Sequence, residues 1–545
     1  MRGAWRAALI GALAAAITTL PGLGVGTLWD NSETAYGEVA REILLSGNWV
    51  VMHLNGRPWF IQPPLYFWLA ALFAKLFGTS EFALRLPSAL ATIAMGGALG
   101  YAVARARDLR TAILASVVLA TALMQAVVGR LAIMDALLDL AVAVAILAWY
   151  GAARGGPRRL WYLGAAAIAL GILAKGPVAL AIPAIVLVPW AVWERRAGTP
   201  LVLPSLRDAL LATALGAALI APWALALLRA AGPAAFSLMI GHYTVGRYLG
   251  TIENQSGPLW YYVPVVILGF FPWSAFLLPA LADAWRAARS REGSLARFAL
   301  VWTVVPFVFF SFAQTKLPNY IALELPALAI LVALWFDAVA DAPKRRAALA
   351  WTALVPAGVA VLGFALWAFS HDNRLTSDLQ QLRSDFAGLG LVVLAGWFAM
   401  WLLWRSRERA WFAPFALAGA SAVAMTIIAV LGEPLVERFK PIPQLAAIVQ
   451  RDRRPGDAVA IEGVSGGNAL LFYTAPVVAQ LAAPGDPGES GDGDFRHAVC
   501  AAPRVFVVTS PQDAIADPSF GRTRRIVARA GRDLLVLYEG APCAD

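Results

Sequence analysis

Apolar stretches long enough to cross a lipid bilayer recur along most of this 545-residue chain, and they limit its fold more than any other feature. Hydrophobic residues make up 60% of the sequence and charged residues 14%, whereas a soluble domain carries about 25% charged residues. A helix that crosses the hydrocarbon core needs about 20 apolar residues. We therefore predict an all-α polytopic membrane domain with about thirteen transmembrane helices, at 5–26, 82–104, 110–129, 132–150, 160–175, 177–193, 208–228, 260–281, 298–314, 317–337, 348–369, 387–404 and 411–431.

The positions of the basic residues predict an orientation in the inner membrane. Lysine and arginine number 44 against 34 aspartates and glutamates, for a net charge of +10. If thirteen helices span the membrane, the basic clusters all fall on one side, at 105–110, 154–159, 195–196, 286–291, 344–346 and 405–409. Positive charge favours the cytoplasmic side, so we expect a cytoplasmic N-terminus and a periplasmic C-terminus. Charges in short loops form no basic surface, and we expect no nucleic-acid partner.

Two outer segments are long enough to carry structure of their own. Residues 27–81 form the first periplasmic loop, with helical patterns at Glu33–Leu45 and Pro64–Leu76 that we expect to lie along the membrane surface as interfacial helices. Residues 230–259 are expected to be a polar loop that leads into an aromatic anchor at 260–262. The predicted membrane domain covers 1–432, and its first span has no persuasive cleavage site, so we expect it to be retained.

The composition changes near residue 433, and we predict a small periplasmic α/β domain over 433–545. Pro441–Gln450 has a helical pattern, and short strands are expected at 458–461, 504–509, 525–528 and 534–538. Cys500 and Cys543 are the two cysteines of the chain. They would form a disulfide in an oxidising compartment or remain as two thiols, because spacing alone does not fix pairing.

Acidic residues at the outer ends of the spans are candidates for function, because ionisable groups near a bilayer are costly. Asp30 and Glu33 follow the first span, and Asp135 opens the fourth. They would orient or deprotonate an acceptor; the alternative is a favourable charge at a helix N-terminus. Asp139 lies one turn after Asp135 and is expected to be structural, and Arg130 could pair with either aspartate.

Basic residues reach the same predicted face. Lys175 begins a Lys-Gly-Pro break, Lys316 and Tyr320 lie in one hairpin, and Arg247 lies in the expected polar loop with His242. Cations of this kind suit a phosphate, although a lysine at the surface could also extend its amine toward water. A single histidine with one carboxylate leaves a divalent cation possible, but it is not a typical metal site, and we assign neither a metal nor another cofactor.

Six segments carry a resemblance that covers nearly the whole chain. They read LWDNSETAYGEVAREILLSGNWV (28–50), HLNGRPWFIQPPLYFWL (53–69), GRLAIMDALL (129–138), LAKGPVALAIP (173–183), LWYYVPVVILGFFPW (259–273) and SFAQTKLPNYI (311–321). In this order they resemble the GT-C superfamily of membrane glycosyltransferases, and within it the ArnT-like aminoarabinose transferases and the protein O-mannosyltransferase-like group.

The resemblance implies a sugar donor linked to a polyprenyl phosphate, a cavity that faces the periplasm, and inversion at the anomeric carbon. The acceptor would be a phosphate of lipid A, another envelope glycan, or a protein serine or threonine. Under this hypothesis three groups of residues have roles. The catalytic carboxylates are Asp30, Glu33 and Asp135; the donor-phosphate ligands are Lys316, Tyr320, Arg247 and Lys175; and the other substrate contacts are Gln62, Tyr36 and His242.

Two motifs depart from the pattern of that family. Its usual Pro-Asp-Glu is Asn31-Ser32-Glu33 here, and the Phe-Glu-Lys-Pro of the ArnT-like enzymes is Phe60-Ile61-Gln62-Pro63. These departures weaken the case for aminoarabinose in particular and leave room for another sugar or acceptor. A flippase for the same lipid would place polar residues in broken helices at the midplane. The charges at the span ends favour surface chemistry instead, and a structural scaffold would leave the clustered cations unexplained.

Overall fold

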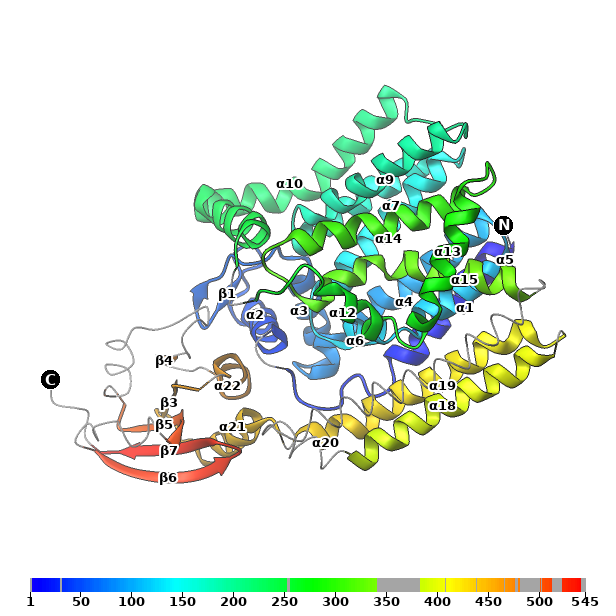
Figure 1. Cartoon of the computed structure of the whole chain (residues 1–545). Coiled ribbons are helices and arrows are strands. Elements are labelled where there is room, and N and C mark those ends of the chain that lie inside the picture. Colours follow the sequence, from blue (N-terminus) through cyan, green and yellow to red (C-terminus); the bar gives the residue numbers. More distant parts are fainter. Residues whose placement is uncertain are drawn as a thin grey trace. The chain divides into compact units, whose positions relative to one another are not determined.

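The computed structural model describes residues 2–29, 32–251, 255–340, 383–406, 408–437, 439–464, 466–475, 479–480, 500, 502–511 and 522–540. The chain divides into two compact units (Figure 1). The first comprises Met1–Leu23, Phe60–Tyr66 and Arg85–Gly432, and the second comprises Gly24–Trp59, Phe67–Leu84 and Glu433–Asp545. The second unit therefore joins most of the first long outer segment to the C-terminal region.

The first unit is built from helices in its described part. They are α1 (Arg2–Thr19), α4 (Glu81–Ala106), α5 (Leu109–Ala120), α6 (Leu123–Arg130), α7 (Asp135–Ala153), α8 (Arg159–Lys175), α9 (Val178–Arg196), α10 (Leu206–Phe236), η1 (Ser237–Gly246), α11 (Arg247–Leu249), α12 (Tyr262–Gly269), η2 (Trp273–Phe276), α13 (Leu277–Ala288), α14 (Ser294–Phe312), η3 (Pro318–Glu324), α15 (Leu325–Ala340), α18 (Arg383–Arg405), η4 (Ala410–Phe412), α19 (Ala413–Ile427) and η5 (Ile428–Gly432). Among the described residues, eight helices are long and apolar enough to cross a membrane, or ten if each of two bent pairs is one span. The predicted helical membrane fold is confirmed, while the count of thirteen stays a prediction. The span expected at 348–369 lies outside the described residues.

Two expected spans are sharply bent. The segment predicted at 110–129 consists of α5 and α6, which meet at 60°, and the segment predicted at 260–281 bends by 109° between α12 and Trp273. Pro272 has no N–H to continue the helical ladder at the second bend. The Trp273 Nε1 donates to Thr121 Oγ1 at 3.1 Å, so the two bends support each other.

The prediction of a polar loop over 230–259 was wrong for most of that range. Helix α10 continues to Phe236, and η1 and α11 extend the helical segment to Leu249. The residues after 230 are rich in alanine and other apolar side chains, which favour a helix. Gly232 has a φ of +72° and stands before Pro233, so the chain bends there and begins a new helix instead of a loop.

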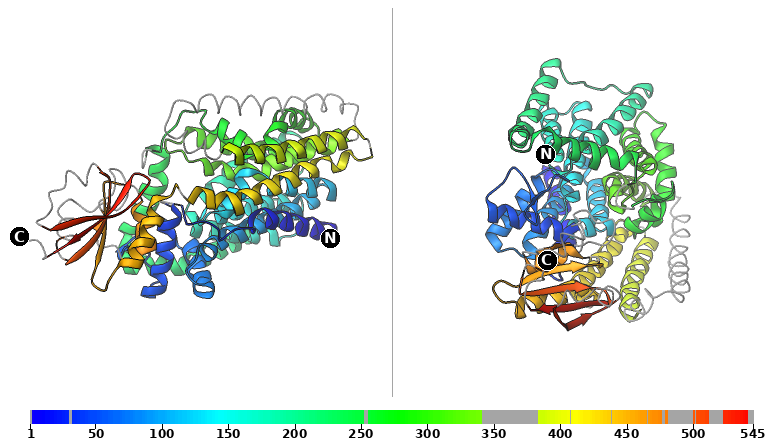
Figure 2. Two further views of the ribbon diagram at one scale, coloured as in Figure 1. Left: turned by 90° about the horizontal axis from the view of Figure 1, so that it is seen from below. Right: turned by 90° about the vertical axis from the view of Figure 1, so that its left-hand side faces the viewer.

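Small residues allow close helix crossings in the first unit. A Cβ on Gly96 of α4 would lie 2.6 Å from the Gly11 carbonyl of α1, and one on Gly100 would lie 2.5 Å from the Ala7 carbonyl. A Cβ on Gly396 of α18 would collide with Ala420 of α19, and these two helices run side by side in Figure 2. Close backbone approach of this kind is the usual basis of packing between membrane helices.

The second unit contains a five-stranded sheet in the order β4-β3-β5-β7-β6. The pairs β3–β4 and β3–β5 are parallel, and β5–β7 and β6–β7 are antiparallel. This unit also holds most of α3. Its elements are α2 (Ser32–Ser46), β1 (His53–Leu54), β2 (Arg57–Pro58), α3 (Leu65–Phe77), α20 (Glu433–Glu437), α21 (Pro441–Asp452), β3 (Ala458–Glu462), α22 (Gly467–Thr474), β4 (Ala479–Gln480), β5 (Arg504–Thr509), β6 (Thr523–Ala530) and β7 (Asp533–Glu539).

The small C-terminal α/β domain expected from the sequence is confirmed, and its four predicted strands match β3, β5, β6 and β7. The two-residue β4 was missed because so short a strand shows no alternation. The predicted helices of the first outer segment correspond to α2 and α3, and their position at a membrane surface stays a prediction. Cys500 is disulfide-bonded, and the only other cysteine of the sequence, Cys543, lies outside the described residues.

Candidate functional site

Asp135 is the centre of a polar cluster inside the first unit. It is the first residue of α7 and is only 5% exposed. Its Oδ1 accepts hydrogen bonds from Lys175 Nζ and from Asn319 Nδ2, each at 2.5 Å. A carboxylate at a helix N-terminus is also favoured by the helix dipole. Asp135 is therefore fixed in direction by side chains from α8 and η3.

The end of α8 positions the lysine of this cluster. Lys175 is the last residue of that helix, and Gly176 follows with a φ of +81°, a conformation that favours glycine. The Gly176 N–H closes the last turn by donating to the Ile172 carbonyl at 2.8 Å. The Lys175 Nζ lies 5.4 Å from the centre of the Tyr320 ring, within the range of a cation–π contact. The Lys-Gly-Pro break thus aims the amine at both Asp135 and Tyr320.

A backbone ladder brings Arg247 and Lys316 to neighbouring positions. Residues 314–316 donate three backbone hydrogen bonds, to the carbonyls of Tyr248, Arg247 and Gln255, at 3.0, 3.0 and 2.9 Å. The Thr315 hydroxyl adds a bond of 2.8 Å to the Gly250 carbonyl. The segment 313–320 then continues to Asn319 and Tyr320 in η3. One short segment therefore carries contacts to α7, α8 and the chain around Arg247.

Both basic residues of this ladder are partly enclosed. Lys316 is 6% exposed and its amine donates to the Ala313 carbonyl. Burial lowers the pKa of Lys316 below its usual range. The guanidinium of Arg247 is 3.4 Å from Gln255 Oε1 and 5.9 Å from the centre of the Tyr243 ring. A buried ammonium group whose partner is a carbonyl oxygen lacks a compensating negative charge, so binding of an anion beside it would stabilise it strongly.

Asn319 contacts Asp135 although the sequence did not predict a role for it. It stands within the Leu-Pro-Asn-Tyr segment beside Tyr320, and that proximity was the available signal. Arg130, which the sequence suggested as a partner of either aspartate, donates to the Thr19 carbonyl at 2.8 Å. Asp139 is 3% exposed, and its Oδ2 has no hydrogen-bond partner in the described part of the chain.

A second buried ion pair shows what a purely structural pair looks like in the same unit. Arg297 and Glu194 are both fully buried, and the guanidinium donates to both carboxylate oxygens at 2.9 and 3.0 Å. Arg297 also bonds the Ala288, Ser290 and Arg291 carbonyls. By contrast, the side chain of Lys175 is 15% exposed beside Asp135. The Asp135–Lys175 pair therefore keeps the access that a ligand needs.

Two of the predicted site residues belong to the second unit. Glu33 is 1% exposed in the first turn of α2, and its Oε2 accepts a bond of 2.8 Å from the Trp29 N–H. Tyr36 is half-buried, and its ring contacts Trp59 and Phe67 at centroid distances of 6.0 and 5.6 Å. Asp30 lies outside the described residues. Glu33 therefore helps to hold the turn before α2, and its role in catalysis stays a prediction.

Residues of the C-terminal region hold the chain just before Asp30. Glu437 accepts bonds from the Thr27 N–H at 2.8 Å and from Lys440 Nζ at 2.9 Å. The Lys440 amine also bonds the Thr27 carbonyl at 2.9 Å and lies 4.1 Å from the centre of the Trp29 ring. The Leu28 N–H donates to the Tyr473 hydroxyl at 2.8 Å. Sequence reasoning missed this clamp because no local pattern reports partners 410 residues apart.

The last two predicted residues lie in the first unit. Gln62 is half-buried in the loop before α3. His242 is exposed on η1, and its ring lies 4.8 Å from that of Tyr243. Across the described residues, no group of three or more histidine, cysteine, aspartate or glutamate side chains is arranged to hold a metal ion.

The comparisons with known proteins agree with this architecture. The dolichyl-phosphate-mannose-protein mannosyltransferase family matches residues 61–226. The structure is similar to that of ArnT from Cupriavidus metallidurans bound to undecaprenyl phosphate, with a TM-score of 0.82, 24% identity and 97% of each chain covered. It also shares the fold of the Archaeoglobus fulgidus oligosaccharyltransferase, with a TM-score of 0.51, 13% identity, and 93% of this chain and 69% of that chain covered. The helical bundle and its charged cluster thus define a membrane protein with the GT-C glycosyltransferase fold.

Curated relatives narrow the class to one family. The chain is 31% identical over 396 residues to the undecaprenyl phosphate-alpha-4-amino-4-deoxy-L-arabinose arabinosyl transferase of Pseudomonas aeruginosa, covering 71% of this chain and 69% of that protein. It is 35% identical over 344 residues to the Erwinia tasmaniensis enzyme of the same name, where the match spans 60% of this chain and 59% of that protein. This chain belongs to the undecaprenyl phosphate-alpha-4-amino-4-deoxy-L-arabinose arabinosyl transferase family.

Proposed function

We propose that this protein is an inverting glycosyltransferase that moves a sugar from undecaprenyl phosphate to lipid A on the periplasmic face of the inner membrane. Family membership supports the donor class, because the relatives are named for undecaprenyl phosphate and aminoarabinose. The observation that carries the proposal is the buried Asp135 carboxylate, which Lys175 and Asn319 hold in place. Asn319 lies on the same segment as Lys316. A carboxylate and several cations at one end of a helical bundle suit a reaction in which a phosphate leaves.

In the proposed reaction one bond forms and one bond breaks at the anomeric carbon of the sugar. An oxygen of the acceptor attacks the anomeric carbon of the sugar, a new carbon–oxygen bond forms, and the bond from that carbon to the carrier phosphate breaks. The carrier phosphate leaves with the electron pair. In this scheme Lys316 and Arg247 stabilise the negative charge on the departing phosphate, and Tyr320 donates a hydrogen bond to it.

Asp135 would orient the acceptor, with Lys175 and Asn319 holding the carboxylate in place. If the acceptor is an ionised phosphate, no base is needed, and if it is a hydroxyl, a carboxylate takes its proton. Asp30 and Glu33 remain proposed catalytic carboxylates, and Gln62, Tyr36 and His242 remain proposed contacts to the substrates. The orientation with a cytoplasmic N-terminus and a periplasmic C-terminal domain follows from the distribution of basic residues.

A transfer assay in nanodiscs tests this function. The purified protein is given radiolabelled aminoarabinose linked to undecaprenyl phosphate, with lipid A as acceptor. We expect labelled lipid A and free undecaprenyl phosphate in equal amounts. A serine-rich peptide and a second donor sugar serve as parallel arms, because Ser32 and Gln62 depart from the family motifs. Movement of the donor across the bilayer without cleavage would contradict the proposal and favour a flippase.

A further inference from the structure

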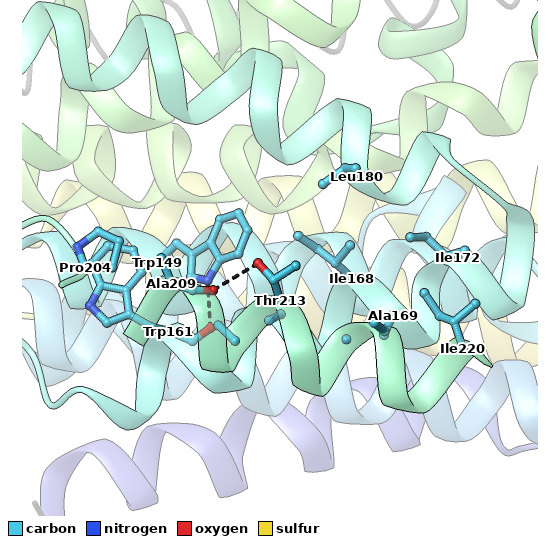
Figure 3. A pocket seen from close by; sticks show the side chains of 14 residues that line it. Trp149, Trp161, Ile168, Ala169, Ile172, Leu180, Pro204, Ala209, Thr213 and Ile220 are labelled. Carbon is cyan, nitrogen blue, oxygen red and sulfur yellow. Dashed lines mark hydrogen bonds between the residues drawn. The ribbon is translucent and has the colours of Figure 1, made fainter. Parts of the chain in front are cut away.

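An apolar groove of about 440 Å³ lies in the first unit, apart from the Asp135 cluster (Figure 3). Residues of α7, α8, α9 and α10 line it. Two of its polar groups are bonded to protein, since Trp149 Nε1 donates to the Trp161 carbonyl at 3.1 Å and the Thr213 hydroxyl to the Ala209 carbonyl at 2.9 Å. The other lining residues are alanine, isoleucine, leucine, glycine, proline and tryptophan, so an apolar chain fits best.

The floor of the groove is made of small side chains. Ala165 and Ala169 of α8 face Ala212 and Gly216 of α10, and a Cβ on Gly216 would lie 3.6 Å from the Ala165 carbonyl. In the span that contains α10, only 17% of the most apolar stretch is buried inside the protein, compared with 72% for α7. A helix so poorly covered by protein faces the lipid, so the groove opens toward the bilayer.

The length of the groove matches one leaflet. Along α10 it runs from Ala209 to Ile220, which corresponds to about 16 Å at the α-helical rise per residue. The hydrocarbon core is about 30 Å thick, so one leaflet contributes about half of that. The acyl chain of a phospholipid would fill this depth, whereas a long polyprenyl chain would extend far beyond it.

Exposed arginines surround one end of the groove. This end holds Trp149 and Trp161, and the arginines lie where α7 ends and where α8 and α10 begin, at Arg154, Arg158, Arg159 and Arg207. An acidic residue, Asp208, lies among them, and it is held by Tyr162 at 2.7 Å, Ser205 at 2.6 Å and Arg158 at 3.5 Å. The four arginines therefore leave an excess of positive charge at the rim.

We propose that the groove holds one acyl chain of an anionic phospholipid, whose phosphate head group lies against these arginines. Basic residues beside an apolar groove between membrane helices attract anionic lipids. Helix α8 begins at this rim and ends at Lys175, so the head-group end of the lipid site and the Asp135 cluster lie at opposite ends of one helix, while the far end of the groove reaches Ile172. The positive-inside rule assigns the rim to the cytoplasmic leaflet. The arginines that bind the head group are therefore separate from the residues of the proposed transfer reaction, and none of the latter in the described part of the chain lines the groove.

Photolabelling tests this site. The full-length protein is placed in nanodiscs with phosphatidylglycerol that carries a diazirine on one acyl chain, and the labelled peptides are mapped by mass spectrometry. We expect labelling of α8 and α10, and much weaker labelling by phosphatidylcholine with the same diazirine chain. Substituting Arg158→Gln should reduce labelling by phosphatidylglycerol about fivefold, while Arg291→Gln, an exposed arginine in another loop, should leave it unchanged.

A matched pair of variants separates the groove from the rim. Ala217→Phe fills the groove, and Ala218→Phe places the same ring on the neighbouring exposed position of α10 that does not line it. We expect the first to abolish labelling of α8 and the second to retain it, with both variants eluting as folded protein on gel filtration. Equal labelling by the two phospholipids, equal labelling of the two variants, or displacement by undecaprenyl phosphate but not by phosphatidylglycerol would overturn the proposal.

Discussion

At the scale of single residues, Lys316 provides a signal that depends on pH. Burial lowers the pKa of this amine, so it loses its charge at a lower pH than an ordinary lysine, whose pKa is about 10.4. The cation is present below the lowered pKa and is lost as the pH rises through it. If Lys316 binds the donor phosphate, kcat/KM should fall on the alkaline side before the ordinary lysine range is reached.

The variant Lys316→Arg provides the comparison, because a guanidinium remains charged throughout this range. Its alkaline fall in kcat/KM should move to higher pH, even if its maximum rate is lower. If the pH profile is the same in both proteins, Lys316 does not bind the donor phosphate.

Glu324 is a buried carboxyl without a visible structural benefit. It is fully buried in η3, and neither of its oxygens has a hydrogen-bond partner in the described part of the structure. Replacing it with Met removes no hydrogen bond, so the melting temperature should stay the same or rise. Arg297→Met is the contrasting variant, because it leaves the fully buried Glu194 without its bidentate partner and should cost about 3–5 kcal/mol. A large loss of stability in Glu324→Met would reveal a partner that this account lacks.

At the scale of elements, the end of α8 determines where Lys175 points. Gly176 has a φ of +81°, and Gly155, after α7, has a φ of +87°. Alanine at either position should cost about 1 kcal/mol, because a side chain is strained in this conformation. Gly176→Ala should also reduce transfer at least several-fold, since it disturbs the lysine that bonds Asp135, whereas Gly155→Ala should lower the melting temperature but leave turnover intact. Equal turnover in the two variants would show that the turn at the end of α8 does not affect the transfer reaction.

The sequence predicted helices better than it predicted their breaks. Long apolar runs such as Asp135–Ala153 and Ser294–Phe312 appear as single helices, because hydropathy reports burial in lipid directly. The bends near Ala122 and Pro272 and the helix through 237–249 escaped prediction, since tertiary packing decides them. Among the candidate site residues, Asp135, Lys175, Lys316 and Arg247 were predicted from their charge at span ends, and Tyr320 from its place in the hairpin with Lys316. Asn319 was missed because a neutral amide does not carry the free-energy cost of an ionisable group near the bilayer.

At the scale of the whole molecule, the first outer segment is bound to the C-terminal region within one unit. Glu437 and Lys440 hold Thr27, and the Tyr473 hydroxyl bonds both the Leu28 N–H and Glu81. Local sequence signals place 27–81 and 433–545 in separate regions, while these long-range contacts join them. The C-terminal region is therefore a support for the loop that carries Glu33.

Loss of the Glu437 carboxylate should loosen this loop. Glu437→Gln removes a charge-assisted bond to Lys440 and weakens those to Thr27, each worth about 1.5–3 kcal/mol. Limited proteolysis should then cut the chain between residues 24 and 31 faster than in the unmodified protein. Arg451→Gln, which removes an exposed ion pair to Asp452, should not change the rate of cleavage. Equal cleavage of both variants would show that the clamp does not stabilise the loop.

The role of Asp135 is tested by measuring single-turnover release of sugar from undecaprenyl phosphate in the presence of lipid A, in the unmodified protein and in Asp135→Asn. We expect the unmodified protein to transfer the sugar and Asp135→Asn to transfer it about ten- to a hundred-fold more slowly. Asp139→Asn, which changes a buried carboxylate one turn away, should stay close to the unmodified rate. Full activity in folded Asp135→Asn would show that this buried carboxylate and its bound lysine do not form the reaction site.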